Sequence, residues 1–213
     1  YALYGDMSGR GMSLLHKFTP DIEVYSIDEA FLSLEPKRRN SLESLAQNIR
    51  EKVYKWTGIP VSIGIAETKV LAKIANKRAK KGELKEKGVL NLYRSAETEN
   101  VLQDTLVQDI WGIGYRSALK LRQNNILNAW QLRETDNRFV RRLLSVVGAR
   151  IALELRGIKC IPFEFVQTKK HNITCSRSFG QSITEFAELR EAILYFLTRA
   201  SEKMRKYSLA ANA

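Results

Sequence analysis

The hydrophobic pattern of the chain alternates between the periods of a helix and of a strand up to about Arg94. Thr68 is a residue suited to cap a helix, and it precedes one of the helical stretches. Strands interleaved with amphipathic helices predict a sheet covered by helices. The spacings predict, in order, a helix to residue 18, a strand pair over 22–34, a helix over 42–56, a strand over 60–66, a helix from 68 to before 82, and a strand over 88–93. The second helix is expected to bury one stripe made of Leu42, Leu45, Ile49, Val53 and Trp56.

Helical spacing then continues throughout residues 95–157, a stretch rich in arginine and punctuated by glycines. This pattern predicts a small all-helical domain. Farther along, Pro162–Lys170 is typical of a linker, Asn172–Ser178 predicts a strand and Leu189–Met204 predicts a helix. The predicted fold class is α+β, with a helix-covered sheet over 1–94, a helical domain over 95–162, a linker over 163–171 and the start of an α/β domain over 172–213.

The net charge of the chain narrows the classes of binding partner. The 213 residues carry 35 Lys and Arg against 23 Asp and Glu, a formal net charge of +12, which favours a polyanion, nucleic acid first and an anionic membrane surface second. No apolar run approaches the length needed to span a bilayer, and the chain does not open with a signal pattern, so a cytoplasmic protein without a membrane partner is expected. Cys160 and Cys175 lack the spacing of a metal site and are expected to be reduced.

Two adjacent carboxylates, Asp28 and Glu29, interrupt the run Tyr25–Phe31, which otherwise resembles a buried strand. In one continuous strand they would face opposite sides of the sheet, whereas a tight turn would present both from a hairpin tip. Convergent carboxylates suit Mg²⁺, and a two-metal centre stabilises both the attacking and the leaving oxygen of phosphoryl transfer. The alternative is a solvated acidic turn, which on these residues alone is the commoner arrangement.

The helix that starts after Thr68 carries a lysine stripe, Lys69, Lys73, Lys77 and Lys80, opposite an apolar face. Such a stripe is most often a solvated helix face. Because this helix follows a strand of the sheet that displays the acidic residues, a lysine at its end is also placed to neutralise a triphosphate.

A third pattern is the run from Ile110 to Leu121, which contains Gly112-Ile113-Gly114 and is followed by Asn125-Ile126. A short helix, a Gly-x-Gly hairpin and a second helix let backbone N–H groups approach a phosphate without reading base sequence. The flanking apolar residues and the basic Arg116 and Lys120 make this a helix-hairpin-helix pattern, with a plain helix–helix turn as the alternative.

In this order the motifs resemble the Y-family translesion DNA polymerases, through nearly the whole chain. The matching segments are Ser26–Phe31, Gly64–Ala66 with Thr68–Asn76, Trp111–Gly114 and Cys175–Gly180. The last segment and the Trp before the hairpin are most similar to the UmuC-like branch of that family. The resemblance implies a partial ferredoxin-like palm over 1–94, a thumb with the helix-hairpin-helix over 95–162 and the start of a little-finger domain over 172–213.

The resemblance also implies a function for particular residues. Asp28 and Glu29 match two catalytic, metal-binding carboxylates, with Glu29 near the primer 3′-hydroxyl, and Lys80 matches the lysine that contacts the incoming dNTP. The DNA-binding residues implied are Gly112, Ile113, Gly114, Arg116, Ser117 and Lys120 in the thumb, and Ser176, Arg177 and Ser178 in the little finger. The implied reaction is error-prone nucleotidyl transfer past damaged bases in the SOS response, with two Mg²⁺ ions. Implied partners are damaged primer-template DNA, a processed UmuD dimer, the sliding clamp and the recombinase filament.

The sequence also departs from the family pattern. The first catalytic Asp, the nucleotide-selecting aromatic residue and the fingers domain of the family have no counterpart after Tyr1, and Asp6 does not replace that Asp. We therefore expect that the chain alone does not polymerise nucleotides. Two other classes remain open: a non-catalytic helix-hairpin-helix DNA-binding module, in which Asp28 and Glu29 point apart into solvent, and a nucleotidyl cyclase, against which the hairpin and the positive charge stand.

Overall fold

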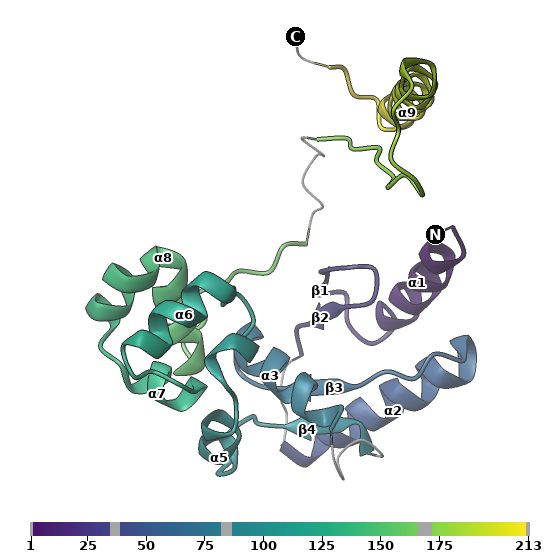
Figure 1. Ribbon diagram of the computed structural model, residues 1–213. Helices are drawn as coiled ribbons and strands as arrows, with labels where there is room; N and C mark the ends of the chain where they lie inside the picture. Colours follow the sequence, from purple (N-terminus) through teal and green to yellow (C-terminus); the bar gives the residue numbers. More distant parts are fainter. Residues whose placement is uncertain (1, 35–38, 82–86, 166–171, 212–213) are drawn as a thin grey trace. The chain divides into compact units, whose positions relative to one another are not determined.

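A computed structural model describes residues 2–34, 39–81, 87–165 and 172–211 of the chain. It divides into two compact units, residues 1–165 and 166–213 (Figure 1). The larger unit contains all four strands of the described residues and every helix but the last.

The strands of the larger unit form two separate pairs. β1 (Ile22–Val24) runs antiparallel to β2 (Ala30–Leu32), and β3 (Ile63–Ile65) runs parallel to β4 (Val89–Asn91). The strand segments predicted from alternation are therefore confirmed, but each strand is only three residues long and no continuous sheet joins the two pairs within the described ranges.

Two helices flank the strands at the N-terminal side of the unit. α1 (Ala2–Leu15) packs against α2 (Arg39–Thr57), with Leu14 and Val53 in a small core between them. The prediction that Trp56 belongs to the buried stripe of α2 is wrong, because its side chain is 72% exposed. Trp56 is in the last turn of the helix, where it lies beneath the ammonium of Lys17 at 5.9 Å.

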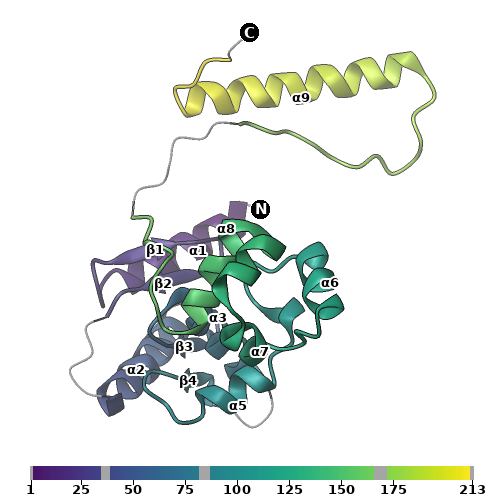
Figure 2. The same cartoon turned by 90° about the vertical axis from the view of Figure 1, so that its left-hand side faces the viewer.

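α3 (Lys69–Ala79) is the central helix of the unit, and both views place it between the α1–α2 pair and the later helices (Figures 1 and 2). Thr68 caps it as predicted, accepting a hydrogen bond from the backbone N–H of Leu71 at 3.4 Å. The helix lies so close to β3 that a Cβ at Gly64 would be 2.3 Å from the carbonyl oxygen of Ala72. Glycine is therefore the residue that allows this contact.

Residues 95–157 are mostly helical, as predicted. Their helices are α5 (Thr98–Gln103), the 3₁₀ turn η1 (Val107–Asp109), α6 (Tyr115–Gln123), α7 (Ala129–Glu134) and α8 (Asn137–Leu155). α8 is interrupted at Ser145, whose φ is 71° and ψ −171°. The main core unites this region with α3 and β4, and contains among others Val70, Leu92, Leu102, Leu121, Leu132 and Leu155.

The described part of the smaller unit, residues 172–211, contains an irregular segment and one helix. α9 (Phe186–Lys206) confirms the helix predicted from spacing, and none of its residues is buried. The strand predicted over Asn172–Ser178 is absent, and these residues have no regular structure. A strand needs a partner for its backbone N–H and C=O groups, and the described part of this unit contains no other strand to supply one.

Candidate metal and nucleic-acid site

The acidic pair, Asp28 and Glu29, lies in the turn between β1 and β2, which we name the acidic hairpin (residues 22–32). The turn is closed by the backbone N–H groups of Tyr25 and Ser26, which donate to the carbonyl oxygen of Glu29 at 3.0 and 3.1 Å. The Ser26 hydroxyl also donates to Oδ1 of Asp28 at 2.6 Å. A tight turn, not a continuous strand, therefore carries both carboxylates, and Asp28 is exposed to solvent.

Glu29 is held by a lysine from the central helix. Its Oε1 atom lies 2.6 Å from Nζ of Lys73, and the two side chains are 33% and 21% exposed. The same ammonium lies 5.5 Å from the ring centroid of Tyr25. The ion pair fixes the Glu29 carboxylate against α3, so a cation that binds Glu29 must compete with Lys73.

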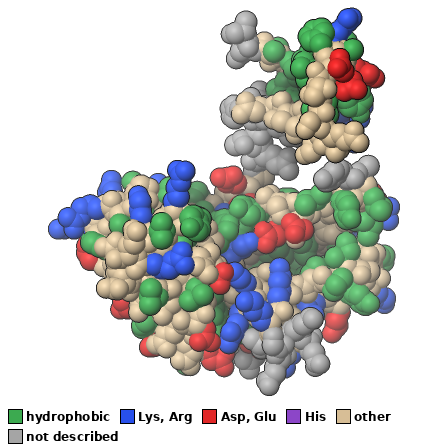
Figure 3. Space-filling model, in the orientation of Figure 1, with side chains coloured by type: hydrophobic (Ala, Val, Ile, Leu, Met, Phe, Trp, Pro, Cys, Tyr) green, Lys and Arg blue, Asp and Glu red, His purple; other side chains and the backbone are tan. Residues whose placement is uncertain are grey.

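The lysine stripe of α3 is solvated only towards its C-terminal end, where Lys77 and Lys80 are exposed. Lys69 is buried, where it hydrogen bonds to the buried carboxylate of Glu23 and donates to the carbonyl oxygen of Pro162 at 2.6 Å. Lys77 pairs with Asp109 at 2.7 Å. Of the four lysines, Lys80 alone is exposed at the C-terminus of α3 without an ion pair to another described residue. Figure 3 shows basic and acidic side chains side by side in the middle of the molecular face that it draws.

The Gly-x-Gly pattern forms a turn, residues 112–114, that we name the glycine hairpin. Gly112 has a φ of 87°, a conformation that favours glycine, and a Cβ there would lie 2.8 Å from the terminal Cδ1 atom of Ile151. A Cβ at Gly114 would have no atom within 4 Å. Gly114 precedes α6, and no side chain caps the first backbone N–H groups of that helix. The helix before the hairpin is only the single 3₁₀ turn η1.

The basic residues predicted around the glycine hairpin lie on the surface of the protein. Arg116 and Lys120 are exposed on α6, Ser117 is half-buried and Ile113 is part of the core. Exposed backbone N–H groups, an uncapped helix N-terminus and two cations together favour an anionic ligand. In the smaller unit, Ser176, Arg177 and Ser178 are exposed in the irregular segment.

A contact between the two hairpins was not predicted from the sequence. The indole N–H of Trp111, directly before the glycine hairpin, donates to the hydroxyl of Tyr25 in the acidic hairpin at 3.1 Å. Their rings meet edge to face, with centroids 5.4 Å apart, and Phe31 packs against both. The two aromatic residues are 86 positions apart, so no local pattern could indicate that they meet.

No group of three or more His, Cys, Asp or Glu side chains is close enough to hold a metal among the residues that the structure describes. The acidic pair offers two carboxylates, a donor set that fits part of a Mg²⁺ centre. No helix in the described ranges is long and apolar enough to cross a membrane.

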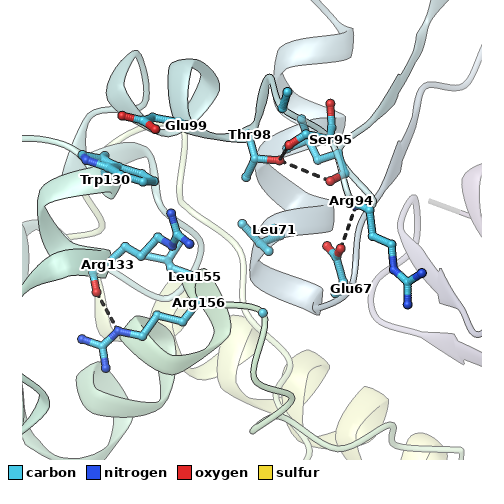
Figure 4. A pocket seen from close by; sticks show the side chains of 13 residues that line it. Glu67, Leu71, Arg94, Ser95, Thr98, Glu99, Trp130, Arg133, Leu155 and Arg156 are labelled. Carbon is cyan, nitrogen blue, oxygen red and sulfur yellow. Dashed lines mark hydrogen bonds between the residues drawn. The ribbon is translucent and has the colours of Figure 1, made fainter.

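A groove of about 570 Å³ in the larger unit lies away from these residues. It is lined from Glu67 and Arg94 on one side and from α7 and the end of α8 on the other (Figure 4). Several polar groups of the groove already have hydrogen-bond partners. The backbone N–H of Arg94 donates to the Glu67 carboxylate at 2.8 Å, and Nε of Arg156 donates to the carbonyl oxygen of Arg133 at 2.6 Å. It contains no residue of either hairpin, so this groove is not part of the candidate site.

Comparison with known protein sequences shows the family to which the chain is related. Models of the impB/mucB/samB family and of its C-terminal domain match residues 1–77 and 170–213, together more than half of the chain. UmuC of Salmonella typhimurium is 40% identical over 206 residues, which are 96% of this chain and 49% of UmuC. The chain belongs to the impB/mucB/samB family. DNA polymerase IV of Clostridium kluyveri is 32% identical over 98% of this chain and 51% of its own length.

Solved structures confirm the resemblance to Y-family polymerases. The insertion ternary complex of Dbh DNA polymerase aligns with a TM-score of 0.63 and 28% identity, over 76% of this chain and 47% of that chain. DinB from Sulfolobus solfataricus aligns with a TM-score of 0.60 and 27% identity, over 72% of this chain and 44% of that chain. The mixed helix and sheet fold is therefore that of Y-family polymerase domains. The chain spans about half the length of the curated relatives it matches.

Proposed function

We propose that this chain contributes a partial palm, a thumb and part of a little finger to a DNA polymerase that performs template-directed nucleotidyl transfer past damaged bases. The observation that carries the proposal is the hydrogen bond from Trp111 to Tyr25, which places an acidic hairpin and a glycine hairpin next to each other in one unit. A phosphoryl-transfer enzyme needs both elements, one for metal ions and one for the DNA backbone. Membership of the family supports the same assignment.

In this proposal Asp28 and Glu29 hold Mg²⁺. Bound there, the metal would stabilise the attacking and leaving oxygens of the transfer, and the complete enzyme would use two ions. Asp28 is exposed and hydrogen bonds to Ser26, whereas Glu29 would have to give up its ion pair with Lys73 to bind the metal. The resemblance to the family implies a further metal-binding Asp, and the described residues contain no group of three or more His, Cys, Asp or Glu side chains that could hold a metal.

The incoming dNTP is assigned to Lys80, at the end of α3. Its exposed ammonium has no carboxylate partner among the described residues, unlike Lys73 and Lys77. It is thus the lysine of the stripe whose charge remains available for a triphosphate.

The DNA backbone is assigned to the glycine hairpin and the start of α6, residues 112–117 with Lys120, as a helix-hairpin-helix contact. Ser176, Arg177 and Ser178 in the smaller unit add a second contact with the backbone. Each phosphate neutralised by such a cation contributes about 0.9 to the slope of log affinity against log salt.

For the whole protein, we also propose the processed UmuD dimer, the sliding clamp and the recombinase filament as partners, on the basis of the resemblance to the UmuC-like branch.

The test is the affinity of the purified chain for a fluorescent primer-template duplex, measured by anisotropy over a salt series. We expect salt-sensitive binding by the wild type, and binding weakened about 10-fold in Gly114→Leu, because the side chain keeps a phosphate from the backbone N–H groups. Gly114 is the suitable position because a Cβ there meets no protein atom, unlike one at Gly112. Gly11→Leu in α1, also in open space, is the matched control.

The acidic pair is tested in the same preparation by Mn²⁺ binding, followed by electron paramagnetic resonance, in the wild type and in Asp28→Asn. Loss of a Mn²⁺ site in Asp28→Asn supports the metal assignment. DNA binding that depends on Gly114 without any Mn²⁺ site at Asp28 would instead favour a non-catalytic DNA-binding module. Wild-type affinity in Gly114→Leu would remove the glycine hairpin from the interface.

A further inference from the structure

We propose that Tyr25 and Trp111 are positioning residues, which couple the place of the DNA backbone on the glycine hairpin to the geometry of the acidic pair. The inference rests on the proposed function and deepens it, because it names the contacts that connect the proposed DNA site with the proposed metal site. Neither residue is assigned as a ligand of metal or DNA. Both act through a neighbour.

The first step of the route joins the two hairpins. Trp111 is covalently next to Gly112, and its indole N–H reaches the Tyr25 hydroxyl at 3.1 Å. The rings are nearly perpendicular, at 82°, and Phe31 closes the cluster with its centroid 5.6 Å from Trp111. An edge-to-face pair with a hydrogen bond at its rim has one preferred arrangement, so a shift of Trp111 requires a shift of Tyr25.

The second step joins Tyr25 to Glu29 in two ways. The backbone N–H of Tyr25 donates to the carbonyl oxygen of Glu29 at 3.0 Å. The ring of Tyr25 also faces Nζ of Lys73 at 5.5 Å, and that ammonium holds the Glu29 carboxylate at 2.6 Å. Displacement of Tyr25 therefore changes both the main chain and the ion pair of a proposed metal ligand.

The third step fixes Trp111 to the glycine hairpin. Gly112 has a φ of 87° and packs on Ile151, and the N–H of Ile113 donates to the carbonyl of Ile110 at 3.0 Å. Asp109 in η1 is tied to Lys77 of α3 at 2.7 Å. The hairpin has little freedom to move without Trp111, because its backbone is constrained on both sides.

The contact is poorly explained as a means of holding the fold together. Tyr25 is 47% exposed and the hydrogen bond is exposed to solvent, so water would satisfy both polar groups if it were broken. Loss of one solvent-exposed hydrogen bond therefore changes the stability of the fold only slightly. Tyr25→Phe and Trp111→Phe keep an aromatic ring and remove the bond, so positioning can be separated from folding.

The experiment measures Mn²⁺ affinity with and without saturating primer-template DNA, in the wild type, Tyr25→Phe, Trp111→Phe and the double variant, with the signal of Asp28→Asn subtracted as background. We expect DNA to change the Mn²⁺ affinity of the wild type about 5-fold or more, the scale of ordinary coupling between two sites. Each single variant should reduce this factor to below about 2, and the double variant should match the singles because all three lose the same bond. Tyr54→Phe, which removes an exposed hydroxyl on α2, should keep the wild-type factor.

The outcomes separate the inference from the function on which it rests. Retention of the wild-type factor in Trp111→Phe and Tyr25→Phe overturns the inference. So does a wild type that binds DNA and Mn²⁺ without coupling, although the proposed function then stands. A wild type that binds neither ligand overturns the proposed function itself, and the inference with it.

Discussion

The carboxylate of Glu154 accepts a hydrogen bond from the backbone N–H of Val70 at 3.3 Å, across 84 positions of sequence. Glu154 is only 1% exposed, and it also accepts from the N–H groups of Cys160 and Ile161 at 2.6 and 3.0 Å. Its carbonyl oxygen accepts from the Thr68 hydroxyl at 2.8 Å. Glu154 thus fastens the end of α8 to the start of α3, the helix that packs against the strand carrying Gly64.

Replacing Glu154 by Ala should therefore be strongly destabilising. Three backbone N–H groups lose their acceptor, which we expect to lower the free energy of unfolding by about 3–5 kcal/mol. Urea unfolding followed by circular dichroism measures the change. Glu134→Ala is the control, because that side chain is exposed and 3.9 Å from Arg133, and it should change stability by less than about 0.5 kcal/mol. Equal effects of the two substitutions would contradict a fastening role for Glu154.

Gly64→Ala should destabilise the chain by about 2–4 kcal/mol, since the added methyl group overlaps the backbone of α3 at Ala72 and Asn76. Backbone atoms cannot turn aside as a flexible side chain can, so β3 and α3 must separate. The same urea titration applies, with Gly9→Ala in α1 as the control because a Cβ there meets nothing within 4 Å. A Gly64→Ala protein as stable as the control would show that the strand–helix contact is looser than described.

Lys73→Gln should raise Mn²⁺ affinity at the acidic pair about 5-fold, because it removes the ammonium that competes for the Glu29 carboxylate. Lys77→Gln is a matched control one turn along the same helix, since its partner is Asp109 and not a proposed metal ligand. Mn²⁺ titration by electron paramagnetic resonance compares the two variants. If both variants bind Mn²⁺ alike, Glu29 is not a ligand.

Ser145→Gly should raise the free energy of unfolding by about 1 kcal/mol, because a φ of 71° with a ψ of −171° is strained for a side chain and free for glycine. Thermal and urea unfolding measure the gain. Ser8→Gly in α1 should have the opposite sign and cost about 0.5 kcal/mol, since Ser8 is in a regular helix. A loss of stability in Ser145→Gly would contradict the interruption of α8.

Local features of the site were predictable because they depend on neighbours in sequence. The Tyr25–Phe31 run allows a turn that presents Asp28 and Glu29 together, and the turn is indeed closed by bonds within five residues. Gly112 is required by a positive φ, and Thr68 caps the next helix within one turn. The assignment of these residues to metal and DNA remains a prediction.

Other features were outside the reach of sequence because their partners are distant. Helical spacing puts Lys69, Lys73, Lys77 and Lys80 in one row, but spacing says nothing of Glu23, Glu29 or Asp109, which neutralise three of them. The strand expected over Asn172–Ser178 has suitable residues, yet a strand exists only where another strand accepts its hydrogen bonds.

The sequence by itself indicated the helices before Arg94, the helical character of residues 95–157, the two turns of the site and the Thr68 cap, since backbone conformation and amphipathic spacing act over a few residues. Only the tertiary structure decided which charges remain available and which elements touch. Burial makes an ion pair such as Lys69 with Glu23 necessary, because neither charge is stable alone in a core. The meeting of Trp111 with Tyr25 likewise follows from the shared core that brings the helical region against α3.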